Sequence, residues 1–207
     1  MEQKVLDKLS YGLFVITTNQ NGRDNGCISS TVVQIASDPM QISVAINKAN
    51  LTCEMILATK KFSVSVIDET ASFDLFKHFG FQSGRDVDKF AECKDCRRLA
   101  NGTMIITKGT NAYFSVDVTS HIDLGSHILF IGTPTEGEVL SNEPSATYAY
   151  YFEHINPNTE KVGTTKEGEI IWRCTICGHE YVGAELPEGY LCPICKHPGS
   201  FFEKVGK

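Results

Sequence analysis

The chain has 207 residues, with 19 Lys and Arg against 25 Asp and Glu, so its formal net charge at pH 7 is −6. This acidic balance, without a basic run, argues against nucleic acid as a partner. No apolar stretch approaches the roughly 18 residues of a membrane-spanning helix, and the start Met1-Glu2-Gln3-Lys4 is not typical of a signal peptide, so we expect a cytoplasmic protein without a membrane partner.

Short β-strand patterns dominate the first 150 residues or so. A short helix packed by Val5, Leu6 and Leu9 is expected first. Strands are then expected over residues 12–18, 28–36, 40–46, 62–67, 113–122 and 127–133. Turn residues from 19 to 26 and the pair Asp38-Pro39 separate the first three strands. Helices are expected over 51–59, 71–79 and 145–152. Many short strands with few helices predict an antiparallel β-barrel.

A polar stretch with Pro157, Gly163 and Gly168 follows, and it predicts a linker over residues 154–168. The chain would therefore consist of a larger domain over residues 1–153 and a small domain over residues 169–207. The small domain is too short to bury a sufficient apolar core alone, so we expect a bound metal to stabilise it.

The small domain carries two Cys-x-x-Cys pairs, Cys174/Cys177 and Cys192/Cys195, with fourteen residues between them. Each such turn directs two sulfurs toward one point, and two facing turns form a tetrahedral cage of four thiolates. Gly178 can turn backbone N–H groups toward the sulfurs, which would help to set a redox potential. Iron and zinc both suit this cage, and the spacing alone does not separate them.

The surrounding residues resemble the rubredoxin family, in the short form found at the end of rubrerythrins. The matching residues are Trp172, Cys177-Gly178, Tyr181, Gly183, Pro187, Cys192-Pro193-x-Cys195 and Phe201-Phe202. Lys196 departs from the pattern, since the second turn of the family usually has glycine there. The resemblance implies one iron bound by four cysteines, with structural zinc as the alternative.

A third Cys-x-x-Cys, Cys93 and Cys96, lies in the larger domain. It has no second pair, so a metal would need further ligands, and a redox-active dithiol is the other functional interpretation. Without an export signal, a reducing cytoplasm is expected, and we predict that these two cysteines are ordinary free thiols.

The larger domain shows neither a dinucleotide-binding Gly-x-Gly-x-x-Gly nor a hydrolase motif. An iron site that takes single electrons needs a donor, and a flavin accepts the two electrons of a hydride and passes them on one at a time. Hydroxyl and amide side chains that could contact a flavin occur at Ser29, Ser30, Thr31, Asn47, Asn50 and Thr52. A helix beginning near Asn50 would favour a phosphate. A polar strand face and simple loop or cap residues are the alternatives.

At these residues the chain resembles the flavin reductase family, whose fold is the FMN-binding split barrel. The matching stretches are Tyr11–Thr17, Asn25-Gly26, Ser29-Ser30, Asp38-Pro39, Asn47, Ser83-Gly84-Arg85, Lys89-Phe90 and Gly125–Gly132. The resemblance implies a homodimer with FMN near the interface, His127 beside the flavin and the nicotinamide, and a flavin or interface role for Arg85. Ser126 replaces the usual aspartate. An ordinary strand histidine and a solvated arginine are the alternatives.

Together the two parts resemble the high-molecular-weight rubredoxins. This resemblance implies an oxidoreductase that passes electrons from NADH or NADPH through FMN to the iron, and then to a soluble acceptor such as a flavodiiron protein that reduces oxygen or nitric oxide. Two other functions stay open. One is a flavin reductase that releases reduced flavin and carries a structural zinc. The other is a carrier that another protein reduces.

Overall fold

The computed structural model describes residues 5, 8–157, 170–174, 179–192 and 198–205. The chain forms two compact units, Met1–Tyr151 and Phe152–Lys207, each with its own sheet. Within the described residues, no helix is both long enough and apolar enough to cross a membrane.

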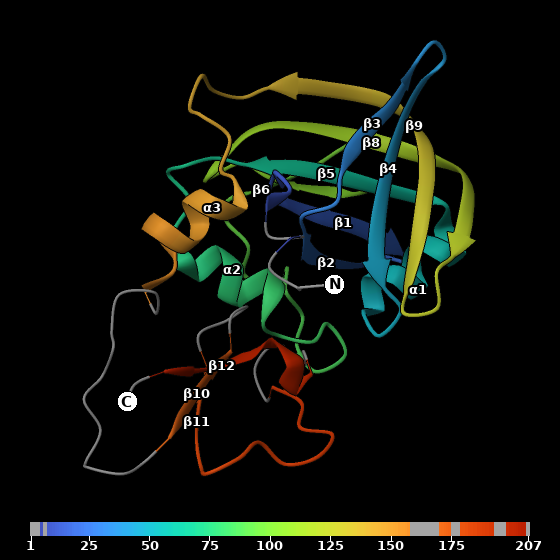
Figure 1. Ribbon diagram of the computed structural model, residues 1–207. Helices are drawn as coiled ribbons and strands as arrows, with labels where there is room; N and C mark the ends of the chain where they lie inside the picture. Colours follow the sequence, from blue (N-terminus) through green and yellow to red (C-terminus); the bar gives the residue numbers. More distant parts are fainter. Residues whose placement is uncertain (1–4, 6–7, 158–169, 175–178, 193–197, 206–207) are drawn as a thin grey trace. The chain divides into compact units, whose positions relative to one another are not determined.

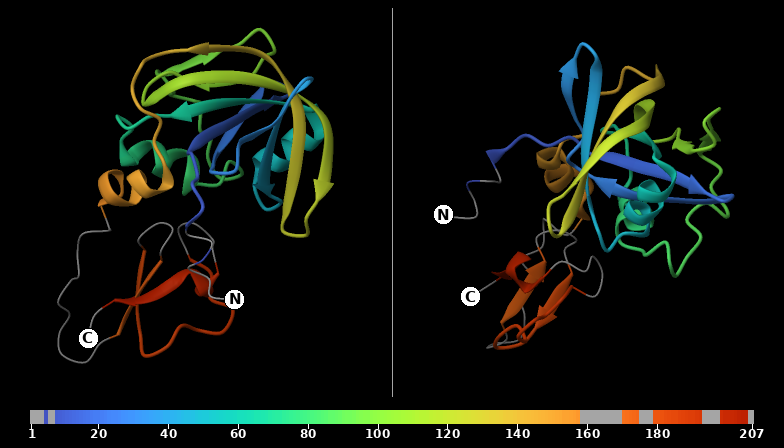
Figure 2. Two further views of the ribbon diagram at one scale, coloured as in Figure 1. Left: turned by 45° about the horizontal axis from the view of Figure 1, so that its top comes forward. Right: turned by 90° about the vertical axis from the view of Figure 1, so that its right-hand side faces the viewer.

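Seven antiparallel strands form the main sheet of the first unit, in the order β2-β1-β5-β8-β9-β4-β3 (Figure 1). The strands are β1 (Phe14–Gln20), β2 (Arg23–Ser29), β3 (Val33–Ser37), β4 (Met40–Asn47), β5 (Lys61–Ile67), β8 (Thr110–Asp123) and β9 (His127–Val139). The sheet curves strongly, and register shifts in β8 at Ser115/Val116 and Val118/Ser120 accompany the curvature (Figure 2). The predicted antiparallel, mainly β fold is confirmed.

Apolar side chains from most of these strands meet in one core. Its fully buried members include Ile16, Val44, Ile56, Phe62, Val64, Val116 and Phe130. Each such side chain contributes roughly 2–3 kcal/mol by leaving water. The alternation of apolar and small residues that predicts β5 places Phe62 and Val64 in this core.

The prediction for the second strand is wrong in its bounds. A two-residue turn at Asn21-Gly22, both with positive φ (54° and 84°), joins β1 to β2, so residues 23–26 belong to the strand and not to the turn. The predicted single strand over 28–36 is two strands. β2 ends at Ser29 because the chain leaves its partner β1 and, from Val33, pairs with β4 instead.

Two of the predicted helices are present. The α1 helix (Leu51–Thr59) has the predicted bounds, and Lys60, with φ 57°, ends it in the left-handed conformation. The α2 helix (Phe73–Gly80) buries Phe76 and Phe79. By contrast, Val5 and Leu9 are 56% and 54% exposed, so they do not pack as the first predicted helix requires, and Leu6 lies outside the described residues.

The helix predicted over 145–152 begins later. Residues 145 and 147 form isolated β-bridges to Asp68 and Gly12, which keep this part extended. A short helix α3 (Tyr148–Tyr150) follows and continues as a π-helical turn, Tyr151–Ile155. A further pair of strands, β6 (Cys96–Arg98) and β7 (Met104–Ile106), forms a small hairpin that the sequence did not predict.

The second unit is built on a three-stranded antiparallel sheet in the order β11-β10-β12. The strands are β10 (Ile171–Cys174), β11 (Glu180–Val182) and β12 (Phe202–Val205). Trp172 pairs with Tyr181, and its indole Nε1 donates a hydrogen bond of 3.0 Å to the Gly183 carbonyl. Lys204 places its ammonium 4.8 Å from the centre of the same indole ring. Trp172, Tyr181 and Gly183, which all carry the rubredoxin resemblance, therefore lie together.

Candidate functional site

The loop between β4 and α1 brings three of the predicted residues together. Asn47 ends β4, and its Oδ1 accepts a hydrogen bond from the Ala49 N–H at 2.9 Å. Asn50 is the N-cap of α1 but makes no side-chain cap hydrogen bond. Thr52, in the first turn of α1, is buried, and its hydroxyl accepts a hydrogen bond of 3.0 Å from the Asn25 amide. Amide and hydroxyl groups therefore gather at this end of α1, but the Thr52 hydroxyl is buried and already paired with Asn25.

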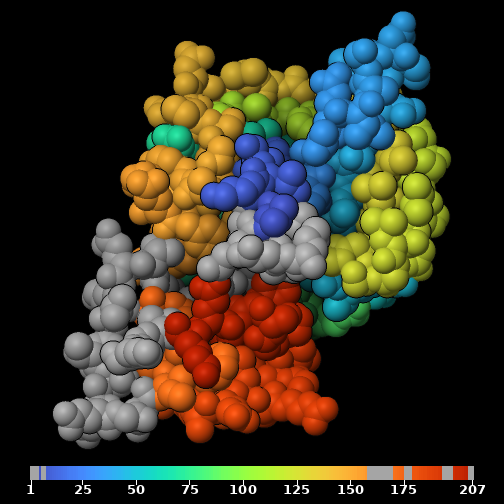
Figure 3. All heavy atoms as spheres, viewed as in Figure 1, coloured from blue at the N-terminus to red at the C-terminus, as the bar shows by residue number. Residues whose placement is uncertain are grey.

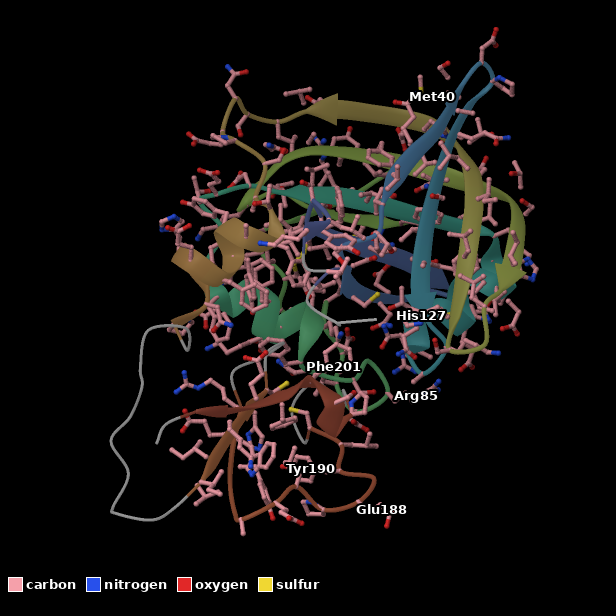
Figure 4. The ribbon with its side chains drawn as sticks, in the orientation of Figure 1. Met40, Arg85, His127, Glu188, Tyr190 and Phe201 are labelled. Carbon is pink, nitrogen blue, oxygen red and sulfur yellow. A yellow bond between two sulfur atoms is a disulfide. The ribbon has the colours of Figure 1, made fainter. Side chains whose placement is uncertain are left out.

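The predicted His127 begins β9 directly opposite Asn47 of β4. Its ring Nδ1 lies 2.9 Å from the Ser126 hydroxyl, and the side chain is half-buried. The Ser126 carbonyl accepts a hydrogen bond from the Lys48 N–H at 3.0 Å, so the two loops are joined. Figure 4 shows His127 at the end of the β4–β9 pair that lies away from Met40, the first residue of β4.

Ser29, Ser30 and Thr31 lie where the chain passes from β2 to β3. The Ser29 hydroxyl is 3.1 Å from the Thr31 hydroxyl. Thr31 Oγ1 also donates to the Ala45 carbonyl and accepts from the Ala45 N–H, both at 3.0 Å. The Thr31 hydroxyl is thus engaged with the backbone of β4, whereas Ser30 is half-buried beside it. Thr31 helps to hold this segment in place, in addition to any contact with a ligand.

Arg85 lies in the irregular segment after α2, and its guanidinium forms an ion pair of 2.8 Å with Glu54 of α1. The side chains of Arg85 and Glu54 are 49% and 63% exposed, so the pair contributes at most about 1 kcal/mol to stability. Its effect is positional, because it holds the segment of Arg85 against the helix that carries Asn50 and Thr52. Figure 4 shows the labelled Arg85 and His127 at the same end of this unit.

Two buried residues near these side chains were not among the predicted site residues. Lys89 is 4% exposed, and burial lowers its pKa to about 8. Cys27 lies close enough to Lys89 for their charges to interact. Burial raises the pKa of the Cys27 thiol. The stretch Lys89-Phe90 carried part of the family resemblance, which was the one sequence signal for Lys89.

In the second unit, two of the four predicted metal ligands are described. Cys174 ends β10, opposite Phe202, and Cys192 follows the bridge between Leu191 and Pro198. Both thiols are almost completely buried, at 1% and 0% exposure. Cys177 and Cys195 lie outside the described residues. Buried thiols on separate strands and loops suit a soft metal, because a thiolate buried without a cation would be costly.

Aromatic rings line the same unit. Tyr190 packs against Phe202 and Tyr181, with ring centres 5.3 Å and 4.9 Å apart. Tyr190 and Phe201 are both labelled in this unit in Figure 4. This apolar shell limits access of water to the cysteines and so lowers the local dielectric constant. Hydrogen bonds and charge–charge interactions near a metal become stronger as a result.

The prediction that Cys93 and Cys96 are free thiols is wrong. The two cysteines form a disulfide, with their Cα atoms 5.7 Å apart. A hydrogen bond from the Cys93 N–H to the Phe90 carbonyl begins the turn that brings them together, and Cys96 is fixed by its pairing with Ile106 in the β6–β7 hairpin. The sequence pattern left a redox-active dithiol open for this pair, but it did not predict the hairpin that holds Cys96.

Comparison with known proteins agrees with the two-part organisation. Residues 6–159 match the flavin reductase like domain, and residues 172–203 match the rubredoxin-like domain of rubrerythrin. The chain is 36% identical to the high molecular weight rubredoxin of Moorella thermoacetica, over 99% of this chain and 100% of that protein. It is 33% identical to the ferric-chelate reductase (NAD(P)H) of Archaeoglobus fulgidus, over 73% of this chain and 89% of that protein.

Solved structures support the fold of the first unit. BorF, the flavin reductase component of a bacterial two-component tryptophan halogenase, superposes with a TM-score of 0.63 at 19% identity, over 70% of this chain and 90% of that chain. An FMN-binding protein from Thermus thermophilus gives a TM-score of 0.61 at 23% identity, over 68% and 82% of the two chains. The curved sheet is therefore a split barrel of the flavin reductase type, and the chain belongs to the flavin reductase like domain family, with a rubredoxin-like domain after it.

Proposed function

We propose that this protein passes electrons from NADH or NADPH through FMN to an iron bound by four cysteines, and from there to a soluble redox protein. The observation that carries this proposal is the presence of both domains in one chain. The match to the Moorella relative, which covers that protein over its full length, supports it. A flavodiiron protein that reduces oxygen or nitric oxide is the acceptor that we propose.

The first unit would hold the flavin. When bound, FMN accepts one hydride, which carries two electrons, and releases these electrons one at a time. The amide and hydroxyl groups of Asn47, Asn50 and Thr52, at the start of α1, would contact the phosphate and ribityl chain. Ser29, Ser30 and Thr31 lie on the adjoining β2–β3 segment and would add further polar contacts. Arg85 would hold its segment over α1 through Glu54.

His127 would act by position. It faces Asn47 across β4 and β9, and its Nδ1 is fixed by the Ser126 hydroxyl. Hydride transfer requires above all that the two rings stack at the right distance and angle. We therefore assign His127 to the orientation of the nicotinamide beside the flavin. It would need neither to gain nor to lose a proton in that role.

The second unit would hold the iron between Cys174, Cys177, Cys192 and Cys195. The domains would span residues 1–153 and 169–207, with residues 154–168 as the linker. A linker of this length raises the effective concentration of the iron domain near the flavin, compared with two separate proteins.

The first unit would form a homodimer through its β3–β4 hairpin. The β3–β4 hairpin carries apolar side chains that are exposed in the single chain: Val33 (55%), Ile35 (48%) and Met40 (49%). Figure 3 shows this hairpin, in light blue, as a projection from the surface of its unit. Exposed apolar side chains gathered on one element favour contact with another protein surface. A second copy of the chain is the partner that we propose.

A metal and flavin assay of the purified protein, followed by anaerobic titration with NADH, tests the proposal. We expect about one iron and one FMN per chain, with both visible spectra bleached by NADH. Zinc in place of iron would instead favour a flavin reductase that releases reduced flavin. Iron that stays oxidised while the flavin bleaches would favour a carrier that depends on another donor.

A further inference from the structure

The Cys93–Cys96 disulfide lies outside the two sites described above. Both cysteines are half-buried, so part of each side chain reaches the surface of the first unit. Only Lys94 and Asp95 lie between them. A disulfide that closes so short a loop restricts the unfolded chain little, and therefore adds less stability than one that closes a long loop. Mechanical support of the fold is a poor explanation for this bond.

An open cavity of about 530 Å³ adjoins the disulfide. Residues from α2, from the turn before it, from the segment after Lys89 and from the turn between β7 and β8 line it. They include Ser72, Asp74, His78, Cys93, Lys94 and Lys108. Cys93 is part of the lining and Cys96 is not. None of the residues predicted to contact the flavin lines this cavity. Of the two cysteines, Cys93 is therefore the one that a thiol in this cavity would contact.

We propose that Cys93 and Cys96 form a reversible dithiol–disulfide couple, and that the cavity admits a thiol reductant that attacks Cys93. In the reductive direction a thiolate of the reductant forms a bond to Cys93 Sγ, and the bond between the two protein sulfurs breaks. Cys96 leaves as the thiolate and takes up a proton. A second thiol then attacks the mixed disulfide and releases Cys93.

The complete reaction transfers two electrons and two protons from the reductant to the protein. The protein disulfide becomes two thiols, and two thiols of the reductant become one disulfide. A dithiol reductant supplies both thiols from one molecule, whereas a monothiol such as glutathione supplies them from two. The reverse reaction, with a disulfide as the oxidant, restores the bond. This couple does not depend on the proposed flavin and iron function.

Two further cysteines provide a contrast within the same unit. Cys27 and Cys53 are 6% and 1% exposed, and burial raises the pKa of Cys53 to about 11. Their thiols are thus protonated at neutral pH and shielded from reagents, and both properties make a thiol unreactive. Cys93 and Cys96 differ from this pair in their exposure and in the cavity beside them.

Peptide mapping of the full-length protein tests the couple. The protein is equilibrated without oxygen in mixtures of reduced and oxidised dithiothreitol, or of reduced and oxidised glutathione. It is then denatured, blocked with iodoacetamide and digested with trypsin, which cuts after Lys89, Lys94 and Arg97. The oxidised form gives peptides 90–94 and 95–97 joined together, and the reduced form gives them separately with both cysteines alkylated.

We expect the joined fraction to rise and fall reversibly as the ratio of oxidised to reduced reagent changes. A fraction that stays near one or near zero across the whole series would overturn the proposal. Comparing the dithiothreitol series with the glutathione series shows whether reduction of the disulfide requires a dithiol or whether a monothiol suffices.

A pair of variants tests the assignment of Cys93 as the attacked sulfur. Cys96→Ser leaves Cys93 as the single thiol of the pair, and Cys93→Ser leaves Cys96. With glutathione disulfide, we expect Cys93 in the first variant to form the mixed disulfide at least about tenfold faster than Cys96 in the second. Equal rates, or faster reaction of Cys96, would contradict the role of the cavity. If either variant does not fold, peptide mapping of the unaltered protein still tests whether the two cysteines form a reversible couple.

Discussion

The Lys89 ammonium donates a hydrogen bond of 2.8 Å to the Gly26 carbonyl, across 63 positions of sequence. A second bond, of 2.9 Å, goes to the Phe79 carbonyl at the end of α2. The residue is 4% exposed. One buried side chain therefore fixes an irregular segment to β2 and to α2 at once, and the Arg85 end of that segment is held over α1.

The pH dependence of stability should show this burial. The pKa of Lys89 is about 8 in the folded chain against 10.5 for an unburied lysine, so between these pH values the unfolded chain binds more protons at this site. The free energy of unfolding should therefore gain about 1 kcal/mol from Lys89 between pH 7 and pH 9. Urea unfolding at both values, followed by far-ultraviolet circular dichroism, measures the gain. Lys89→Met should lose it, and identical pH slopes for the two proteins would contradict the prediction.

Gly84→Ala should destabilise the first unit. A Cβ at Gly84 would overlap the Asn25 side chain, whose amide donates to Thr52 in the first turn of α1. Displacing Asn25 should cost about 1–3 kcal/mol, because both polar groups are buried. Gly80→Ala is the matched control, since its Cβ would meet only the Ile28 side chain, at 3.3 Å. Equal midpoints of thermal unfolding for the two variants would show that Asn25 can move without loss.

Cys192→Ser should remove the metal and leave the flavin reaction intact. Cys192 is completely buried in the second unit, and serine is a poor ligand for a soft metal. We expect loss of the iron absorption bands, with unchanged FMN content and unchanged flavin bleaching by NADH. Cys53→Ser, a buried cysteine of the first unit, should keep the iron bands. Loss of flavin reduction in Cys192→Ser would show that the two domains do not act separately.

His127→Ala should slow the reduction of FMN by NADH at least about tenfold, and weaken FMN binding by less than about threefold, because the side chain orients the nicotinamide. Stopped-flow absorbance measures the first quantity and a flavin fluorescence titration the second. Ser126→Ala removes the hydroxyl that lies 2.9 Å from His127 Nδ1 and should give a smaller effect of the same kind. Reduction at the original rate in His127→Ala would remove this histidine from the site.

Ile35→Glu should weaken the proposed homodimer. Ile35 is 48% exposed on β3, and a carboxylate buried at an interface would be left without a partner. We expect the apparent mass in sedimentation velocity to shift from two chains toward one. Val87→Glu alters another exposed apolar residue, 37% exposed and outside the hairpin, and should keep the mass unchanged. A single-chain mass for the unaltered protein would itself refute the dimer.

Local sequence signals predicted much of the fold and a part of the site. The bounds of α1 followed from the loop of asparagines before it, and the strand β5 followed from its alternation. The boundary between β2 and β3 could not be predicted, because it depends on a change of partner strand from β1 to β4. The order of apolar and polar residues along one segment carries no information about which strand that segment pairs with.

Contacts between residues far apart in sequence account for the other differences. Arg85 and Glu54 are separated by 31 positions, and nothing near either residue indicates that they meet. The disulfide depends on the β6–β7 hairpin, whose strands have three residues each and are too short to give a recognisable β-strand pattern. By contrast, Asn47 was predicted from its amide side chain and from family resemblance, and His127 from the resemblance, and the two are paired in the sheet.

The chain contains one tryptophan, and Trp172 lies on β10 beside the Cys174 end of the strand. Its ultraviolet emission therefore reports on the small unit alone, with no added dye. Oxidised flavins absorb in the range where tryptophan emits, so a bound flavin would accept energy from Trp172 when the two units approach. The lifetime of that emission, compared with and without bound FMN in the oxidised protein before NADH is added, would report how closely the two units approach.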